Sequence, residues 1–499
     1  MTSVVVIGSG PAGVSVAKGL LERGCAVTLI DVGNTLEVDK QVLLHNIQKQ
    51  AGIAEIDALC YSANGKEKLK LPYGSNFIYE TVNEHFAYDI QSGYFNPSFA
   101  QGGLSNVWGG VLAEYSAKEL MDWPQDCRDL SHYYRTIIRW FDQYYQADTE
   151  SVLSAQASYL KNQWDVHQDT LCDHGFSFST AQLAVDFNRC CFCRLCQYGC
   201  PYGLIYHSTL HLELLKKQLH FTYIQGMVVE NFSEKNNYVT VIVKNIKDGH
   251  SSAIDCDRLF VACGAGLSSL LYLRALNKPN HTVYLKDSQH FMLPCLVNKK
   301  MNGVMQSSSH ALCQLKFSVA HEKIAHYPVY LQLYTYMKLF EEEVKSKLKL
   351  LYPMAKPWIK PWLARLVVMQ GYLDVRESNH LAVQYQPSGK WTIKADQIKP
   401  VAIIIDSLLR HLKQNSHYLA LKPLGFLLSK SLVGQSNHVS GSLPMSELPQ
   451  GDETDIWGRP NFFKKIHFVD GSILPSMPAG PVTLTMMANA YRIGKECPL

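Results

Sequence analysis

The sequence predicts an α/β chain, α+β overall, in which an antiparallel-sheet unit interrupts a parallel-sheet domain. A buried run at 4–7 precedes a glycine-rich turn, a helix and a second strand at 26–30, which is the order of a β-α-β unit. An alternating run at 238–243 and a strand at 259–264 predict a hairpin or meander that ends in another glycine turn. Farther along, alternation at 329–336 predicts a strand of a separate sheet.

The glycine-rich turn predicts a Rossmann-type dinucleotide site. Glycines permit a tight turn and let the backbone approach a pyrophosphate at a helix N-terminus. The acid that ends the second strand, about 20 residues on, is placed to accept hydrogen bonds from a ribose. A glycine turn without a ligand would not explain that acid, although the motif does not separate NAD from FAD. The expected contacts are Gly8, Gly10, Pro11, Ala12, Gly13 and Asp31.

Length, composition and charge narrow the class of protein. A chain of 499 residues with 47% hydrophobic content is long enough for two or three cores. A formal net charge of +4 is too small to argue for nucleic-acid binding. The first strand begins at residue 4, so we expect no cleavable signal peptide, and 14 cysteines then read as reduced thiols. We therefore expect a cytoplasmic protein.

A cysteine-rich loop at 188–203 carries the spacing C-x2-C-x2-C-x3-C-P. This spacing is typical of bacterial iron–sulfur proteins, whereas zinc sites usually need two C-x2-C pairs far apart. A zinc site and a loop without metal remain the alternatives. Since no second run of this kind occurs, the sequence favours a single cluster. The expected ligands are Cys190, Cys193, Cys196 and Cys200.

Three further segments have the composition of loops packed on a flat ligand. The first, at 101–110, places four glycines around one Trp; the second runs from 227 to 266; the third is the tail from 467 to 494. The residues expected to contact the ligand are Gly102, Gly103, Ser105, Asn106, Trp108, Gly109, Val228, Gly264, Asp470, Gly471 and Thr483.

Together these segments resemble the glucose–methanol–choline (GMC) family of FAD-dependent oxidoreductases. The order of fingerprint, G-G-x-S-x-x-W-G-G loop, A-x-G-A-G turn and tail matches, and the cysteine run is similar to that of the family's iron–sulfur branch. The resemblance implies FAD and a [3Fe–4S] or [4Fe–4S] cluster. Some members attach FAD covalently through a histidine where this chain has Val107, so we expect non-covalent FAD.

By the same resemblance His438 is the catalytic base. A neutral imidazole can take the proton of a hydroxyl while hydride leaves its carbon. The family's second catalytic group, a His or Asn in the tail, falls here on Pro481 or Gly480, neither of which has a side-chain donor. The second group either comes from elsewhere in the chain, for which His290 and His321 are candidates, or is absent.

The predicted domain bounds are 1–275 for the FAD-binding part, 276–430 for substrate binding and 431–499 for the return to the first domain. The stretch 352–368 mixes lysines with tryptophans, as membrane-surface segments do, and peripheral membrane contact stands beside ordinary packing or a pocket lid as an interpretation. Pro357 and Pro361 argue there against a continuous amphipathic helix.

The expected function is an FAD-dependent dehydrogenase that oxidises a hydroxyl group of a sugar-like or lipid-like alcohol. Electrons would leave through the cluster to an external one-electron acceptor. The alternatives are a flavoprotein with a non-redox or electron-transfer role and a zinc-stabilised, degenerate binding protein.

Overall fold

The computed structural model describes residues 1–50, 70–143 and 152–499. Its centre is a parallel sheet with the strand order β22-β11-β1-β2-β7. The strands are β1 (Ser3–Ile7), β2 (Ala26–Asp31), β7 (Phe221–Gln225), β11 (Arg258–Val261) and β22 (Ile466–Phe468). All neighbouring pairs are parallel. Strands β1 and β11 are rich in buried Val, Leu and Phe because both faces of a parallel sheet are covered.

Helices α1 (Pro11–Leu21) and α13 (Thr483–Glu496) pack together beside this sheet. Their close approach depends on small residues, since a Cβ added to Gly19 would lie 2.8 Å from the carbonyl oxygen of Tyr491. Because β22 and α13 come from the C-terminus, the domain is assembled from distant parts of the chain. The predicted discontinuous Rossmann-type domain is thereby confirmed.

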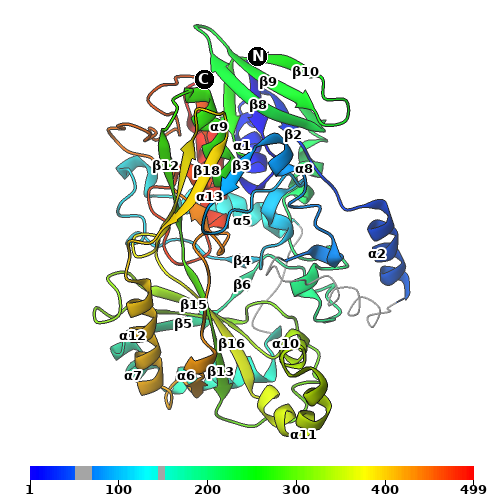
Figure 1. Ribbon diagram of the computed structural model, residues 1–499, viewed down its shortest axis with the longest axis vertical. Helices are drawn as coiled ribbons and strands as arrows, with labels where there is room; N and C mark the ends of the chain where they lie inside the picture. The colour runs from blue at the N-terminus through cyan, green and yellow to red at the C-terminus, as the bar shows by residue number, and fades with distance from the viewer. Residues whose placement is uncertain (51–69, 144–151) are drawn as a thin grey trace.

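An antiparallel meander follows β7, as the alternating run predicts, and lies near both termini at the upper end in Figure 1. Its strands are β8 (Met227–Glu234), β9 (Val239–Asn245) and β10 (Ser251–Cys256).

A seven-stranded antiparallel sheet forms the lower half of the molecule in Figure 1. Its strands are β5 (Phe176–Thr180), β13 (His290–Val297), β14 (Leu315–Val319), β15 (Val329–Tyr334), β16 (Leu366–Tyr372), β19 (Leu421–Pro423) and β20 (Ser429–Lys430). Helices α6 (Ala155–Val166) and α12 (Val401–Gln414) bury apolar side chains in the core formed with this sheet. The predicted antiparallel-sheet domain is confirmed, whereas its bounds remain predictions; β5, which belongs to this sheet, precedes residue 276.

A five-stranded sheet packs its buried side chains, among them Leu285, Leu381 and Ile393, into the core of the parallel-sheet domain. Its strands are β3 (Tyr88–Ile90), β12 (Thr282–Asp287), β17 (His380–Tyr385), β18 (Trp391–Asp396) and β21 (Val439–Ser440). The remaining strands, β4 (Val111–Leu112) and β6 (Gln182–Leu183), pair with each other. Further α-helices in the described ranges are α2 (Val38–Gln50), α4 (Val82–His85), α5 (Ser131–Asp142), α7 (Gln168–Asp173), α8 (Thr209–Leu215) and α9 (Ala265–Leu276).

The sequence prediction was wrong about the Lys-Pro-Trp stretch, which is helical. Helix α10 (Lys338–Leu348) leads through a short 3-10 turn into α11 (Tyr352–Leu363), which continues through Pro357 and Pro361. Each of these prolines removes one hydrogen bond to the carbonyl four residues earlier. Their spacing of four keeps them on one exposed face, so water can bind the freed carbonyls. None of the helices in the described ranges is both long enough and apolar enough to span a bilayer.

Candidate functional site

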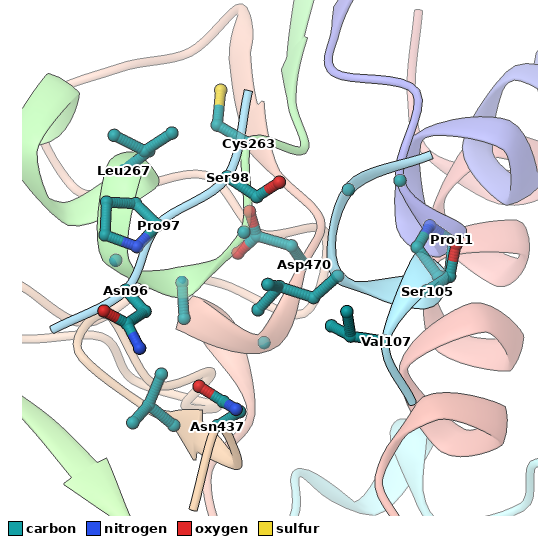
Figure 2. Close-up of a pocket in the computed structure, with 18 of the residues that line it drawn as sticks. Pro11, Asn96, Pro97, Ser98, Ser105, Val107, Cys263, Leu267, Asn437 and Asp470 are labelled. Carbon is teal, nitrogen blue, oxygen red and sulfur yellow. The ribbon is translucent and has the colours of Figure 1, made fainter. Parts of the chain in front are cut away.

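A cavity of about 380 Å³ runs between the carboxyl ends of the parallel strands and the large antiparallel sheet. At one end it is lined by Gly8 and Asp31, which follow or end β1 and β2, and at the other by His438 and Gln370. Ligands of open α/β sheets bind at the carboxyl ends of strands. Figure 2 shows Pro11, Ser105, Val107, Asn437 and Asp470 around this space.

The glycines of the first turn are required by close backbone contacts. Gly8 has φ +97°, and a Cβ there would lie 2.6 Å from the carbonyl oxygen of Ala262. A Cβ on Gly13 would overlap the carbonyl oxygen of Gly8. Gly13 therefore supports the turn from behind, while Gly8, Gly10, Pro11 and Ala12 line the cavity.

Asp31 lies at the nucleotide end, where its carboxylate accepts a hydrogen bond from Ser9 Oγ. Ser9 Oγ in turn accepts a 2.8 Å hydrogen bond from the N–H of Gly102, so one hydroxyl joins the first turn to the 101–110 loop. Burial raises the pKa of Asp31 to about 7, and the hydrogen bonds from Ser9 oppose that rise. A ribose hydroxyl would give this carboxyl a further donor. The sequence prediction missed the linking role of Ser9.

The 101–110 loop contributes Gly103, Ser105, Trp108 and Gly109 to the cavity wall. Asn106 does not line this cavity; its Nδ2 donates to the carbonyls of Gln101 at 2.9 Å and Gly103 at 2.7 Å. Gly102 likewise lies behind the wall. Asn106 and Gly102 thus shape the loop that presents the lining residues.

The meander, the glycine turn before α9 and the tail supply another wall of the cavity. Its lining residues include Val228, Gly264, Asp470, Gly471 and Thr483. The Asp470 carboxylate accepts hydrogen bonds from Ser268 Oγ at 2.5 Å and Ser472 N at 2.9 Å. Burial raises its pKa, and these hydrogen bonds oppose the rise.

His438 lines the cavity from the loop before β21. Its ring stacks on Tyr372 with centroids 4.9 Å apart and an interplanar angle of 19°. Its Nδ1 is buried and has no hydrogen-bond partner among the described residues. Burial lowers the pKa of His438 to about 4, so the imidazole is neutral at pH 7 and can accept a proton.

The backbone of His438 is fixed from both sides. Its N–H donates to Ser436 Oγ at 2.8 Å, and its carbonyl accepts from Ser288 N at 3.0 Å. Ser436 Oγ and the N–H of Gly434 donate to the two oxygens of buried Asp287. Asp287 therefore organises the loop that carries the imidazole.

Four polar side chains of the antiparallel sheet face the same cavity as His438. They are Gln332, Tyr334, Gln370 and Tyr372, and we call them the polar wall. Gln332 and Gln370 are opposite one another in the β15–β16 register. The Tyr334 hydroxyl donates to Gln332 Oε1 at 2.9 Å. The predicted strand at 329–336 thus supplies two of the four residues, whereas the sequence prediction did not identify the strand opposite it.

Neither histidine predicted as a replacement for the second catalytic group lines the cavity. His290 packs against Tyr372 with ring centroids 5.0 Å apart, and its Nδ1 lies 2.8 Å from Ser431 Oγ. His321 contacts His411, with ring centroids 4.8 Å apart. Pro481 does line the cavity and offers no donor.

The cysteine loop lies directly behind Trp108. A second cavity, of about 290 Å³, is lined by Trp108, Cys196 and Cys200. Lys70 borders both cavities and donates from Nζ to the Trp108 carbonyl at 3.3 Å. Trp108 therefore separates the first cavity from two of the predicted metal ligands.

Three of the predicted ligand sulfurs accept hydrogen bonds from backbone N–H groups. Phe192 N lies 3.4 Å from Cys190 Sγ, Ala311 N 3.4 Å from Cys196 Sγ and Leu204 N 3.3 Å from Cys200 Sγ. The donor chemistry suits an iron–sulfur cluster, in which each thiolate binds its own iron. However, within 1–50, 70–143 and 152–499 no three His, Cys, Asp or Glu side chains form a group that could hold a single metal ion. Among the described residues the loop is therefore not a preformed site for a single ion such as zinc.

Comparisons with known proteins agree with this architecture. Residues 2–96 match the family described as pyridine nucleotide-disulphide oxidoreductase. No match is found among curated proteins. Among solved structures, pyridoxine 4-oxidase from Mesorbium loti is similar, with a TM-score of 0.61 and 12% sequence identity over 99% of both chains. At this identity the likeness concerns the fold alone, in which a Rossmann-type parallel-sheet domain is joined to an antiparallel-sheet domain.

Proposed function

We propose that this protein is an FAD-dependent oxidoreductase of the GMC type that oxidises a hydroxyl group. The observation that carries the proposal is a single cavity in which the glycine turn after β1, the 101–110 loop and His438 all take part. The family match at 2–96 and the overall likeness to pyridoxine 4-oxidase support an oxidoreductase of this architecture.

FAD bound in this cavity supplies an acceptor for hydride. The residues of the chain bind and orient the reactants and move the proton. Asp31 would hold the ribose through hydrogen bonds, and the N-terminus of α1 would hold the pyrophosphate. His438, neutral at pH 7, takes the hydroxyl proton of the substrate at a ring nitrogen. Stacking on Tyr372 and the Asp287–Ser436 hydrogen bond hold the imidazole in place.

The polar wall supports a substrate with more than one hydroxyl group, such as a sugar-like alcohol. A glutamine side chain both donates and accepts hydrogen bonds, which is what a hydroxyl group needs. Gln332 and Gln370 lie opposite one another on the sheet and both line the cavity. We propose that one of them, or Tyr372, provides the second contact to the reacting oxygen that Pro481 lacks.

We further propose that the cysteine loop holds an iron–sulfur cluster that passes electrons to an external one-electron acceptor. The spacing of the cysteines, the N–H groups near three sulfurs and the position behind Trp108 support it. The proton-transfer role of His438 does not depend on this cluster. Protein purified without air should contain three or four irons per chain with matching sulfide, by analogy with single-cluster sites of ~3–4 irons.

The test of the main proposal is His438→Ala in FAD-loaded protein. We expect FAD to stay bound and substrate-driven flavin reduction, followed anaerobically by loss of the yellow absorbance, to slow by ~10²–10⁴-fold. His321→Ala, a substitution of a histidine away from the cavity, is the matched control and should behave as the native protein does. Reduction of the His438→Ala flavin at the native rate would contradict the proposed base.

A further inference from the structure

The outer face of the α10–α11 hairpin carries large apolar side chains in solvent. Leu350, Trp358 and Met354 are 94%, 81% and 78% exposed, and Leu351 and Trp362 are also exposed. In Figure 1 this hairpin lies at the lower end of the molecule, away from the meander and both termini. Exposed apolar groups gathered in one place mark interaction sites more often than scattered ones do.

Helical geometry puts four of these residues on one stripe. Leu351, Met354, Trp358 and Trp362 follow each other at spacings of three, four and four residues, so they share a face along ~16 Å of helix. We call these four residues the outer stripe.

The outer stripe is not needed to attach the hairpin to the fold. A different face of α11, with Ile359 and Leu363, packs on Val304 and Tyr336. Glu341 of α10 accepts hydrogen bonds from Tyr336 and Tyr352 and lies 3.6 Å from Lys356 Nζ. The hairpin is thus held by its inner side.

The segment around the stripe is strongly basic. Residues 338–365 contain six lysines and one arginine against three glutamates, a formal net charge of +4, which equals the net charge of the whole chain. Lys349 and Lys360 of this segment are exposed. The rest of the chain has equal numbers of basic and acidic residues. The formal net charge of the protein therefore comes from the segment that carries the outer stripe.

We propose that the outer stripe docks on an anionic phospholipid surface. Tryptophan favours the boundary between headgroups and acyl chains, and lysines beside it are attracted to anionic headgroups. An amphipathic helix with tryptophan on one side and lysine on another lies in the plane of such a surface. A second copy of this chain fits less well, because a symmetric dimer would bring two segments of charge +4 face to face.

Docking would also bring the cysteine loop close to the lipid. A cavity of about 340 Å³ lies between the hairpin and that loop and is lined by Lys356 and Lys360 on one side and Cys193 and Arg194 on the other. The docking proposal is independent of the reaction catalysed and of the metal content of the loop.

The test is co-sedimentation of the full chain with vesicles of phosphatidylcholine containing about one third phosphatidylserine. We expect the native protein to bind these vesicles and to bind pure phosphatidylcholine far more weakly. Replacing both tryptophans (Trp358→Ala with Trp362→Ala) should lower the partition coefficient ~100-fold, since each buried indole contributes about a factor of 10. Lys349→Glu with Lys360→Glu should lower it ~10–100-fold and reduce its dependence on salt.

Matched controls come from exposed residues of the other domain. Leu219→Ala and Leu448→Ala remove side chains that are as exposed as the stripe, and Lys247→Glu changes a charge in the β9–β10 turn. All three should bind vesicles as the native protein does. Thermal unfolding of each variant should match that of the native protein, because the changed side chains lie in solvent.

A second measurement needs no variant. Lipids brominated near the headgroup should quench part of the native tryptophan fluorescence, whereas unbrominated vesicles should not. Failure of the native protein to bind, equal binding to neutral vesicles, or native-like binding by the double tryptophan variant would each overturn the proposal. The proposal would also be overturned if the native protein were a dimer in solution and the double tryptophan variant a monomer, because a second copy of the chain would then cover the outer stripe.

Discussion

Asp287 is buried beneath the loop that carries His438, and replacing it should affect both stability and catalysis. Its carboxylate accepts hydrogen bonds from Gly434 N at 2.8 Å and from Ser436 Oγ, and Ser436 Oγ accepts from His438 N. Asp287→Ala leaves two donors without their acceptor, at about 1–3 kcal/mol each. We expect the free energy of unfolding to fall by about 2–4 kcal/mol.

The same change should displace the imidazole. A misplacement of about 1 Å can cost ~10²-fold in rate, so flavin reduction in Asp287→Ala should slow by ~10–100-fold. In Asp287→Asn the amide oxygen still accepts from Gly434 N, and the Ser436 hydroxyl can turn to accept a hydrogen bond from the amide nitrogen. We therefore expect the rate of flavin reduction in this variant to lie within a few fold of the native rate. These values are measured by chemical denaturation and by anaerobic stopped-flow reduction.

The pH dependence separates Asp287→Asn from the native protein. Burial raises the pKa of Asp287 from 3.8 to about 7. The folded state therefore holds this proton more tightly than the unfolded state does, and its contribution to the free energy of unfolding decreases as the pH rises from about 4 to about 7. The asparagine variant should lack this decrease.

The control for these measurements is Asp406→Ala, which removes a half-exposed aspartate 3.6 Å from Lys430. It should change the free energy of unfolding by less than about 0.5 kcal/mol. If Asp287→Ala is as stable and as active as this control, the proposed support of His438 by Asp287 is wrong.

Three further results are expected. Gly13→Ala should abolish FAD binding, measured as bound flavin per chain, because its Cβ would overlap the Gly8 carbonyl. Cys196→Ser should remove the iron found in anaerobically purified protein, whereas Cys191→Ser, at an exposed cysteine outside the predicted ligand set, should retain it; equal iron in both would contradict the cluster. The rate of flavin reduction should stay constant as the pH falls through 6.5 and drop only near 4, since the imidazole of His438 remains neutral until then. A midpoint near 6.5 would show that His438 is not the group that titrates.

The features that could be predicted from the sequence are those that depend on residues close together in the chain. The turn after β1 needs glycine where the backbone of Ala262 approaches, and that need is visible as Gly8 and Gly13 in one short motif. Strand β2 ends at Asp31, as the position of the acid indicated. The middle strand of the meander, β9, followed from the alternation of apolar residues at 238–243.

Features that depend on distant segments were not predictable in this way. Strand β5 comes before the cysteine loop in the chain but pairs with β14, more than 130 residues later. No local sequence pattern indicates this pairing. Helix α11 shows the limit of a local rule, because a proline normally interrupts a helix. Here Pro353, Pro357 and Pro361 share one solvent-exposed face, and the packing of Leu363 on the opposite side stabilises the helix.

The missing partner of His438 is the same kind of problem. The tail motif places Pro481 where a donor was expected, and from that position alone the site looks incomplete. The polar groups come instead from the opposite side of the cavity, where residues two apart on a strand share a face: Gln332 with Tyr334, and Gln370 with Tyr372. A slip of one residue between β15 and β16 would separate Gln332 from Gln370. The register of these two strands, and not a tail motif, therefore determines which polar groups line the cavity.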